Sequence, residues 1–145
     1  MQNKHLIRNA VIGDAETIAV LASQLDPANP ASIRNRLSRL LSSPSNKVLV
    51  IIVDSIVIGW IHGAITTTVE SDPAVEIMGL IVDKNHRRKG IAKALVEEIV
   101  NWAKKENFPR VRVRSNLTRE ESHVFYKDIG FTEIKKQQVY DLLLK

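Results

Sequence analysis

The chain has 145 residues, of which 44% are hydrophobic and 26% are charged, so we expect a single folded domain over residues 1–145 with its own core. It contains no cysteine, which excludes disulfides, thiolate metal sites and a covalent thioester on the protein itself. No apolar run is long enough to span a bilayer and the first residues show no signal-peptide pattern. We therefore expect a cytoplasmic protein without a membrane partner.

The formal net charge of +5 lies entirely in the second half of the chain. Residues 1–75 carry six basic and six acidic side chains, whereas residues 76–145 carry fifteen basic and ten acidic ones. A basic half indicates an anionic partner. The charge alone fits a nucleic acid and a phosphorylated cofactor equally well.

Hydrophobic periodicity and turn residues predict strands and helices in mixed order. In chain order, we expect a strand at 5–9, helices at 15–25 and 31–41, strands at 47–53, 56–68 and 74–82, a helix at 91–106, a strand at 111–115 and a helix from about 118 to 130. Residues 131–145 are expected to form two short strands or one hairpin. The mixture of hairpins with a strand–helix–strand unit predicts an α+β sheet with helices on its faces.

The segment His86–Ala92 places positive charge where a helix disfavours it. It contains two arginines and a lysine and leads into an apolar periodic segment that begins at Ile91, so it occupies a helix N-terminus. That end carries partial positive charge and unsatisfied N–H groups, and it normally attracts an acidic or hydroxyl side chain. The first turn has no acid, and Gly90 lets a ligand approach the backbone closely. This pattern predicts a bound anion, most naturally a phosphate.

A basic run is also typical of a solvated loop, so the context decides between the two interpretations. The residues Ala74–Val82 before it are mostly apolar and rich in β-branched types, as in a buried strand. A strand, a short basic loop with glycine, and a helix form the layout of a phosphate-binding turn. The context therefore favours the anion site.

Three blocks of the chain resemble the GNAT superfamily of N-acetyltransferases, which use acetyl-coenzyme A (acetyl-CoA). The pattern RxxGxA at 87–92 is similar to the pyrophosphate loop of that family. Asn116 followed by YxxxGF at 126–131 resembles its second block, and IRxAxxxD at 7–14 is typical of its start. Arg88 departs from the commonest pattern, in which glycine stands at this position. The three blocks follow in the right order, so the resemblance covers essentially the whole chain.

The resemblance implies a fold and a co-substrate. The fold is a GNAT-like α+β structure, with a mixed, mostly antiparallel sheet of six to seven strands, about four flanking helices and a central strand splayed at a bulge near Gly79. Acetyl-CoA would bind with its pyrophosphate on the basic loop and its pantetheine arm along the central strand, without a metal. The implied cofactor-binding residues are Leu80, Ile81, Val82, Arg87, Arg88, Lys89, Gly90, Ile91, Ala92, Asn116 and Tyr126. As a loop residue, Asn116 also suits a simple turn.

Two residues are candidates for catalysis. The family's matching tyrosine lies near the cofactor sulfur, so the resemblance implies Tyr126 as the acid that protonates the leaving thiolate. Glu76 is a candidate base, because it lies in an otherwise apolar strand and stands eleven residues before Arg87, a spacing at which some family members have their base. Many other members deprotonate the amine through ordered water. The structural alternatives are a core tyrosine at Tyr126 and, for Glu76, an edge position that faces solvent or pairs with an arginine.

The activity implied by the resemblance is transfer of an acetyl group from acetyl-CoA to a primary amine. No cysteine is available for an acyl relay, which favours direct attack in a ternary complex. The acceptor is expected to be a small-molecule or peptide amine. The loop acids Asp26, Glu70 and Asp72 are candidates for attracting it, and they equally suit ordinary surface loops.

Two other functions remain open. The protein could bind CoA as a sensor, a pseudo-enzyme without turnover. It could also bind nucleic acid through its arginines, but aromatic residues make up only 5% of the chain, which is few for base stacking, and no nucleic-acid motif occurs. Homodimers are common in the GNAT superfamily that the chain resembles, and the strands expected at residues 131–145 are a candidate interface.

Overall fold

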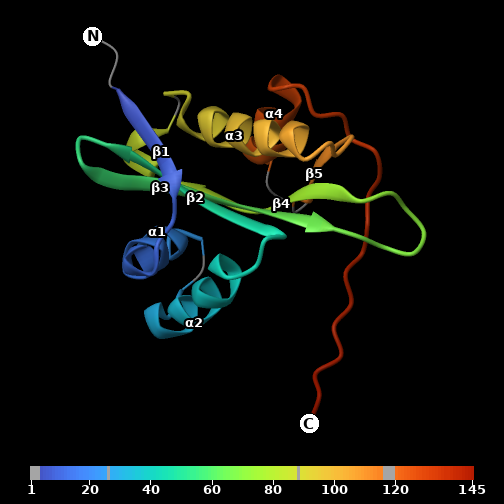
Figure 1. Ribbon diagram of the computed structural model, residues 1–145, viewed down its shortest axis with the longest axis horizontal. Helices are drawn as coiled ribbons and strands as arrows, with labels where there is room; N and C mark the ends of the chain where they lie inside the picture. Colours follow the sequence, from blue (N-terminus) through green and yellow to red (C-terminus); the bar gives the residue numbers. More distant parts are fainter. Residues whose placement is uncertain (1–3, 26, 88, 116–119) are drawn as a thin grey trace. The chain divides into compact units, whose positions relative to one another are not determined.

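The computed structural model describes residues 4–25, 27–87, 89–115 and 120–145 (Figure 1). The chain forms two compact units, residues 1–114 and residues 115–145. The elements of the first unit are β1 (His5–Asn9), the 3-10 turn η1 (Ile12–Asp14), α1 (Ala15–Ala22), α2 (Pro30–Leu41), β2 (Asn46–Val53), β3 (Ile56–Thr66), β4 (Ala74–Val82), the 3-10 turn η2 (Lys84–His86), α3 (Ile91–Lys105) and β5 (Val111–Val113). The second unit contains α4 (Glu120–Asp128). No helix in the described ranges is long and apolar enough to cross a membrane.

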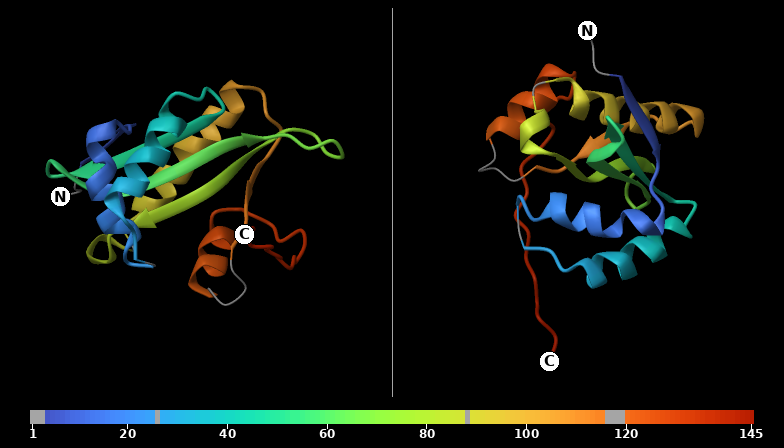
Figure 2. Two further views of the ribbon diagram at one scale, coloured as in Figure 1. Left: turned by 90° about the horizontal axis from the view of Figure 1, so that it is seen from below. Right: turned by 90° about the vertical axis from the view of Figure 1, so that its left-hand side faces the viewer.

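The first unit is built on one sheet with the strand order β1-β2-β3-β4-β5. The first four strands pair antiparallel, and β4 pairs with β5 in parallel. Asp54 and Ser55 adopt positive φ and close the β2–β3 hairpin with a two-residue connection. The longer loop between β3 and β4 projects beyond the sheet (Figure 2). This mixed, mostly antiparallel sheet confirms the predicted α+β fold.

Helices cover both faces of this sheet (Figures 1 and 2). On one face, buried apolar residues of α1 and α2 form a cluster with Val48 and Val50 of β2. On the other face, Leu95 and Ile99 of α3 are fully buried. Gly63 of β3 lets α3 approach closely, because a Cβ at this position would lie 2.9 Å from Cδ1 of Ile99.

β4 contains the bulge that the sequence analysis predicted. In its ladder with β3, Gly79 stands opposite His62 and Ile77 stands opposite Gly63, so Met78 is the extra residue. On its other side β4 pairs with β5 over three residues only, and that pairing ends at Ile77. Within the described chain, the part of β4 after the bulge therefore has a strand partner on one side alone.

Two predicted features are wrong. Residues 131–145 contain no strand, so the described chain forms a sheet of five strands rather than six to seven. A strand is stable only when its backbone groups pair with another strand, and this segment has no such partner in the described chain. The helix predicted to reach Leu25 ends at Ala22, where the chain enters a turn in which Ser23 Oγ donates to the carbonyl of Val20.

Candidate active site

The predicted phosphate loop directly follows β4. The strand ends at Val82, η2 forms one tight turn, and α3 begins at Ile91. Asp83 stabilises this turn twice, because its carbonyl accepts the backbone N–H of His86 at 2.8 Å and its carboxylate lies 3.0 Å from Nδ1 of the same residue. The strand–turn–helix layout expected from the sequence is therefore present.

Gly90 is the N-cap of α3 and adopts the left-handed conformation, with φ 75° and ψ 9°. Apart from its chain neighbours, no described residue has a heavy atom within 4 Å of the position that a Cβ would take, so the space beside it is open. The first turn of α3 contains no acidic residue, and no side chain caps the helix. Open space beside uncapped N–H groups fits a phosphate group.

The other predicted cofactor residues fall into three groups. Leu80–Val82 lie beyond the bulge, on the part of β4 that β5 leaves unpaired in the described chain. Tyr126 belongs to the second unit. Arg88 and Asn116 lie outside the described residues.

Gln24, which the sequence analysis missed, holds the end of β4. Its Nε2 donates to the carbonyl of Val82 at 3.3 Å, and its Oε1 accepts the backbone N–H of Lys84 at 2.9 Å. One side chain from the turn after α1 thus fixes the residues on both sides of Asp83. A lone glutamine in a polar turn carries no local signal of such a contact, which spans about 60 residues of sequence.

Glu76 is 5% exposed and forms an ion pair with Arg114, which follows β5. Its register partner on β5 is Arg112. Arginine offers several donors to a carboxylate, and an ion pair compensates the cost of burying the charge. The structure thus brings Glu76 to an arginine, which is the structural alternative that the sequence left open.

His62 of β3 forms a second polar pair on the same face of the sheet as Glu76. Side chains of one face alternate along a strand, so His62 and Ala64 share a face, and Ala64 stands opposite Glu76. His62 Nε2 lies 2.8 Å from Oδ1 of Asn46, the first residue of β2. Burial lowers the pKa of His62.

In the second unit, the YxxxGF block forms the end of a helix. Gly130 has φ 105°, a conformation that glycine adopts without strain, and it ends the helical segment of α4. The Phe131 N–H then donates to the carbonyl of Tyr126 at 2.9 Å, and the two rings meet edge-on at 5.4 Å. Phe125 contacts the Tyr126 ring from a second direction at 5.1 Å.

The IRxAxxxD block has a structural role at the other end of the chain. Arg8 donates to both carboxylate oxygens of Asp14, at 2.8 and 3.0 Å, and Asp14 also accepts the N–H of Val11 at 2.8 Å. The hydrogen bonds from Arg8 hold the pKa of Asp14 below its ordinary value. This bidentate pair joins β1 to the start of α1.

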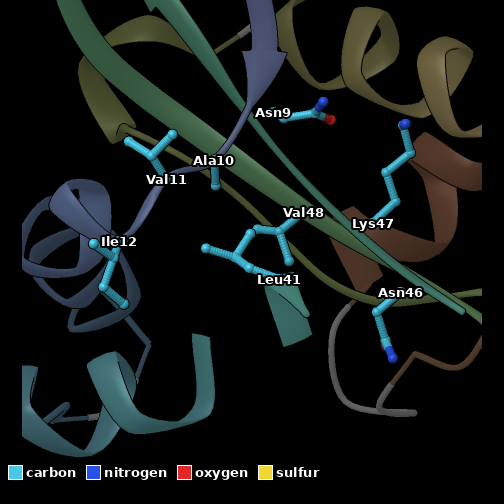
Figure 3. Close-up of a pocket in the computed structure, with 8 residues that line it drawn as sticks. All are labelled: Asn9, Ala10, Val11, Ile12, Leu41, Asn46, Lys47 and Val48. Carbon is cyan, nitrogen blue, oxygen red and sulfur yellow. The ribbon is translucent and has the colours of Figure 1, made fainter. Parts of the chain in front are cut away.

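A pocket of about 480 Å³ opens beside β2, where β1 has ended (Figure 3). Asn46 and Lys47, at the start of β2, project from the strand in opposite directions (Figure 3). The residues that line the pocket are Asn9, Ala10, Val11, Ile12, Leu41, Asn46, Lys47 and Val48. None of the predicted site residues lines it.

The chain is similar in sequence to several known proteins. An N-acetylaspartate synthetase of Danio rerio is 32% identical over 73 residues, which are 50% of this chain and 26% of that protein. The chain thus spans about a quarter of the length of that curated relative. An aminoglycoside N(6')-acetyltransferase type 1 of Acinetobacter haemolyticus is 25% identical over 130 residues, covering 90% of this chain and 83% of that protein.

The fold is also similar to that of solved structures. The solved structure of an aminoglycoside N-acetyltransferase in complex with CoA superposes with a TM-score of 0.88 at 19% identity, covering 98% of this chain and 97% of that one. Residues 16–131 match the profile of the "Acetyltransferase (GNAT) family". That match includes β4, the phosphate loop and the YxxxGF block, so the chain belongs to the GNAT acetyltransferase family.

Proposed function

We propose that this protein transfers the acetyl group of acetyl-CoA to a primary amine, by direct attack of the amine within a ternary complex. The observation that carries the proposal is the N-terminus of α3 beside the open space at Gly90, directly after a strand whose last residues have no partner on the β5 side in the described part of the chain. Membership of the GNAT family supports it, as does the CoA complex of a structural neighbour.

In this proposal the pyrophosphate of CoA binds the N–H groups from Arg87 to Ala92. Both the partial positive charge of the helix end and the side chains of Arg87 and Lys89 attract the phosphates. The pantetheine arm pairs with the free edge of β4 along Leu80–Val82 in the manner of an added strand. Arg88 and Asn116 complete the proposed site on the sequence resemblance alone.

The proposed chemistry needs two proton transfers and one stabilised oxygen. A backbone N–H of β4 near Leu80 or Ile81 stabilises negative charge on the thioester oxygen. The Tyr126 hydroxyl gives a proton to the departing thiolate. Glu76 is the base proposed from the sequence. Its Oε1 accepts a hydrogen bond from Arg114, so we also consider other proton acceptors on the same face of the sheet.

The acceptor is proposed to be a small-molecule or peptide amine. The small-molecule class is supported by the relatives named aminoglycoside N-acetyltransferases, one of which aligns over 90% of this chain. The loop acids Glu70 and Asp72, both exposed, are the proposed attractants for a cationic amine.

Calorimetric titration of the purified protein with acetyl-CoA tests the proposal, with ATP and a short duplex DNA as controls. Selective micromolar binding of acetyl-CoA is expected. Salt-sensitive DNA binding without acetyl-CoA binding would refute it in favour of a nucleic-acid module. Tyr126→Phe should keep acetyl-CoA affinity and lose about 100-fold in turnover. A protein that binds acetyl-CoA but acetylates no amine in a broad panel would be the CoA sensor.

We also propose that the protein forms a homodimer through residues 138–145. These residues are extended, and five of their large apolar side chains are 84–90% exposed: Val139, Tyr140, Leu142, Leu143 and Leu144. Burying about 100 Å² on each of them, in two copies that exchange this segment, gives an interface of about 1,000 Å², the size of a small specific interface. A second copy is the partner that supplies this area symmetrically.

Light scattering with size-exclusion chromatography tests the dimer. The double variant Leu142→Asp/Leu144→Asp should be monomeric with unchanged circular dichroism. Val69→Asp is the matched control, because Val69 is a fully exposed apolar residue of the β3–β4 loop, and this variant should remain dimeric. A monomeric wild type, or a dimer that survives the double substitution, would refute the proposed interface.

A further inference from the structure

The pair His62–Asn46 is a polar feature on the same sheet face as Glu76 that the sequence reasoning did not use. His62 stands opposite Gly79 in the β3–β4 ladder, and the ring of Trp60 occupies the space over this glycine. Glu76 projects from the same face and is diagonal to His62 across the two strands. Both side chains therefore border the bulge beyond which β4 loses its β5 partner.

The hydrogen bonds around Asn46 favour one tautomer of His62. Asn46 Nδ2 donates to Oγ of Ser43 at 3.1 Å, and its Oδ1 faces the imidazole. Because Oδ1 can only accept, Nε2 of His62 carries the proton and donates it at 2.8 Å. In the neutral ring Nδ1 is then an unprotonated acceptor, and it has no partner among the described residues.

The elements around the imidazole carry both acidic and basic residues. β2 carries only Lys47, whose ammonium lies over the Trp102 ring at 5.7 Å on the opposite face, and β4 carries only Glu76, which Arg114 pairs. α1 carries Glu16, which is exposed and lies 3.8 Å from Arg34 of α2, and α2 also carries Arg36 and Arg39. β5 carries Arg112, and α3 packs on the far face. Desolvation lowers the pKa of His62, so its imidazole is neutral near pH 7 and free to take a proton.

We propose that His62, rather than Glu76, removes the proton from the ammonium of the acceptor, an inference that rests on the proposed acetyl transfer. The proton moves from the ammonium nitrogen to Nδ1, directly or through one water, and leaves a neutral amine. The amine lone pair forms the C–N bond as the C–S bond of the thioester breaks, and the second amine proton ends on the CoA thiol. The imidazolium returns its proton to solvent. Asn46 is a positioning residue, because it holds the ring in the Nε2–H form.

Nitrogen NMR of the full-length protein tests the tautomer without any knowledge of the acceptor. The His62→Gln variant identifies the signals of His62 among the four histidines of the chain. We expect the Nε2–H tautomer near pH 7 and protonation of Nδ1 only below pH 6.5, the ordinary pKa of histidine. An Nδ1–H tautomer would overturn the proposal.

Kinetics test the role, with neamine as the first acceptor of an amine panel. His62→Gln should lower kcat/KM about 100-fold and leave acetyl-CoA affinity unchanged, whereas His5→Gln, a change at an exposed histidine of β1, should alter neither. The wild-type kcat/KM should fall as pH drops through the pKa of His62. That acid limb should vanish in His62→Gln and move to higher pH in Asn46→Asp, where a carboxylate stabilises the imidazolium.

The outcomes separate this inference from the proposed function. If acetyl-CoA does not bind, the proposed acetyl transfer fails. If acetyl-CoA binds and an amine is acetylated, but His62→Gln stays within threefold of the wild type, the inference about His62 alone fails. An acid limb that disappears in Glu76→Gln and persists in His62→Gln would assign the base to Glu76 and overturn the proposal. Added imidazole should partly restore a His62→Ala variant.

Discussion

Replacing Gly90 by alanine changes the backbone preference of the proposed phosphate loop and little else. The residue has φ 75°, and the added methyl group meets no heavy atom within 4 Å. A non-glycine residue in the left-handed region costs about 1–2 kcal/mol. Gly90→Ala should therefore lower the free energy of unfolding by about 1–2 kcal/mol, which is a 5- to 30-fold change in the folding equilibrium.

Two other glycines provide controls for this substitution. Gly13 also has empty space around its Cβ position, but its φ is not positive, so Gly13→Ala should change the free energy of unfolding by less than about 0.5 kcal/mol. Gly130 has φ 105° and empty space, so Gly130→Ala should be destabilised in the same way as Gly90→Ala. Urea unfolding followed by circular dichroism measures all three. Equal stability of Gly90→Ala and Gly13→Ala would refute the left-handed assignment.

Gly90→Asp separates the stability of the loop from its affinity for phosphate. Aspartate tolerates the left-handed region better than alanine and is a favoured N-cap, so Gly90→Asp should be at least as stable as Gly90→Ala. Its carboxylate, however, occupies the open space proposed for the pyrophosphate. Calorimetry should show acetyl-CoA affinity at least tenfold weaker for Gly90→Asp than for Gly90→Ala, a difference of about 1.4 kcal/mol. Equal affinity would refute a phosphate site at this helix end.

Three further substitutions test the framework around the site. Asp14→Asn should cost about 2 kcal/mol at pH 7 in urea unfolding, because it breaks the bidentate pair with Arg8. Since Arg8 lowers the pKa of Asp14, this stabilisation is complete above the ordinary carboxyl pKa of about 3.9 and is lost as pH falls through the lower folded value, so variant and wild type should converge in strong acid. Gly79→Ala would place Cβ 2.8 Å from Cζ3 of Trp60 and should cost about 1–3 kcal/mol in thermal unfolding; an unchanged Tm would mean that the ring moves aside. Gln24→Ala should speed amide exchange at the end of β4, with little change in global stability; unchanged exchange would show that its two hydrogen bonds are dispensable.

Local patterns predicted the part of the fold that contains the candidate site. β4 is a run of apolar and β-branched residues, and the structure gives it the predicted bounds Ala74–Val82. α3 begins at Ile91, where the basic loop ends, and its buried residues lie on the predicted apolar stripe. Each of these features depends on neighbours within a few positions, which is the range over which periodicity carries information.

The polar pairs at the site were not predictable in the same way. Glu76 and Arg114 are 38 residues apart, and His62 and Asn46 are 16 apart, so only the strand register brings the partners together. Alternating patterns predict which face a side chain takes but not which strand lies beside it. The strands predicted at residues 131–145 are wrong for a related reason. Several of these residues favour a strand, but the described part of the chain contains no strand that pairs with them.

The bulge and the ion pair indicate different roles for Glu76 and His62 on this sheet face. Ile77 is the last residue of β4 that pairs with β5, and the bulge residue Met78 follows it directly. Glu76 lies one residue before Ile77, and its carboxylate pairs with Arg114. Arg114 lies two residues after Arg112, which is the register partner of Glu76 on β5. Only the Glu76 side of the pair is buried, so removing Arg114 would leave a buried carboxylate without its partner, and the pair links the two strands where their pairing ends. The Glu76 carboxylate is therefore engaged by Arg114 at this junction, whereas Nδ1 of His62 has no partner among the described residues.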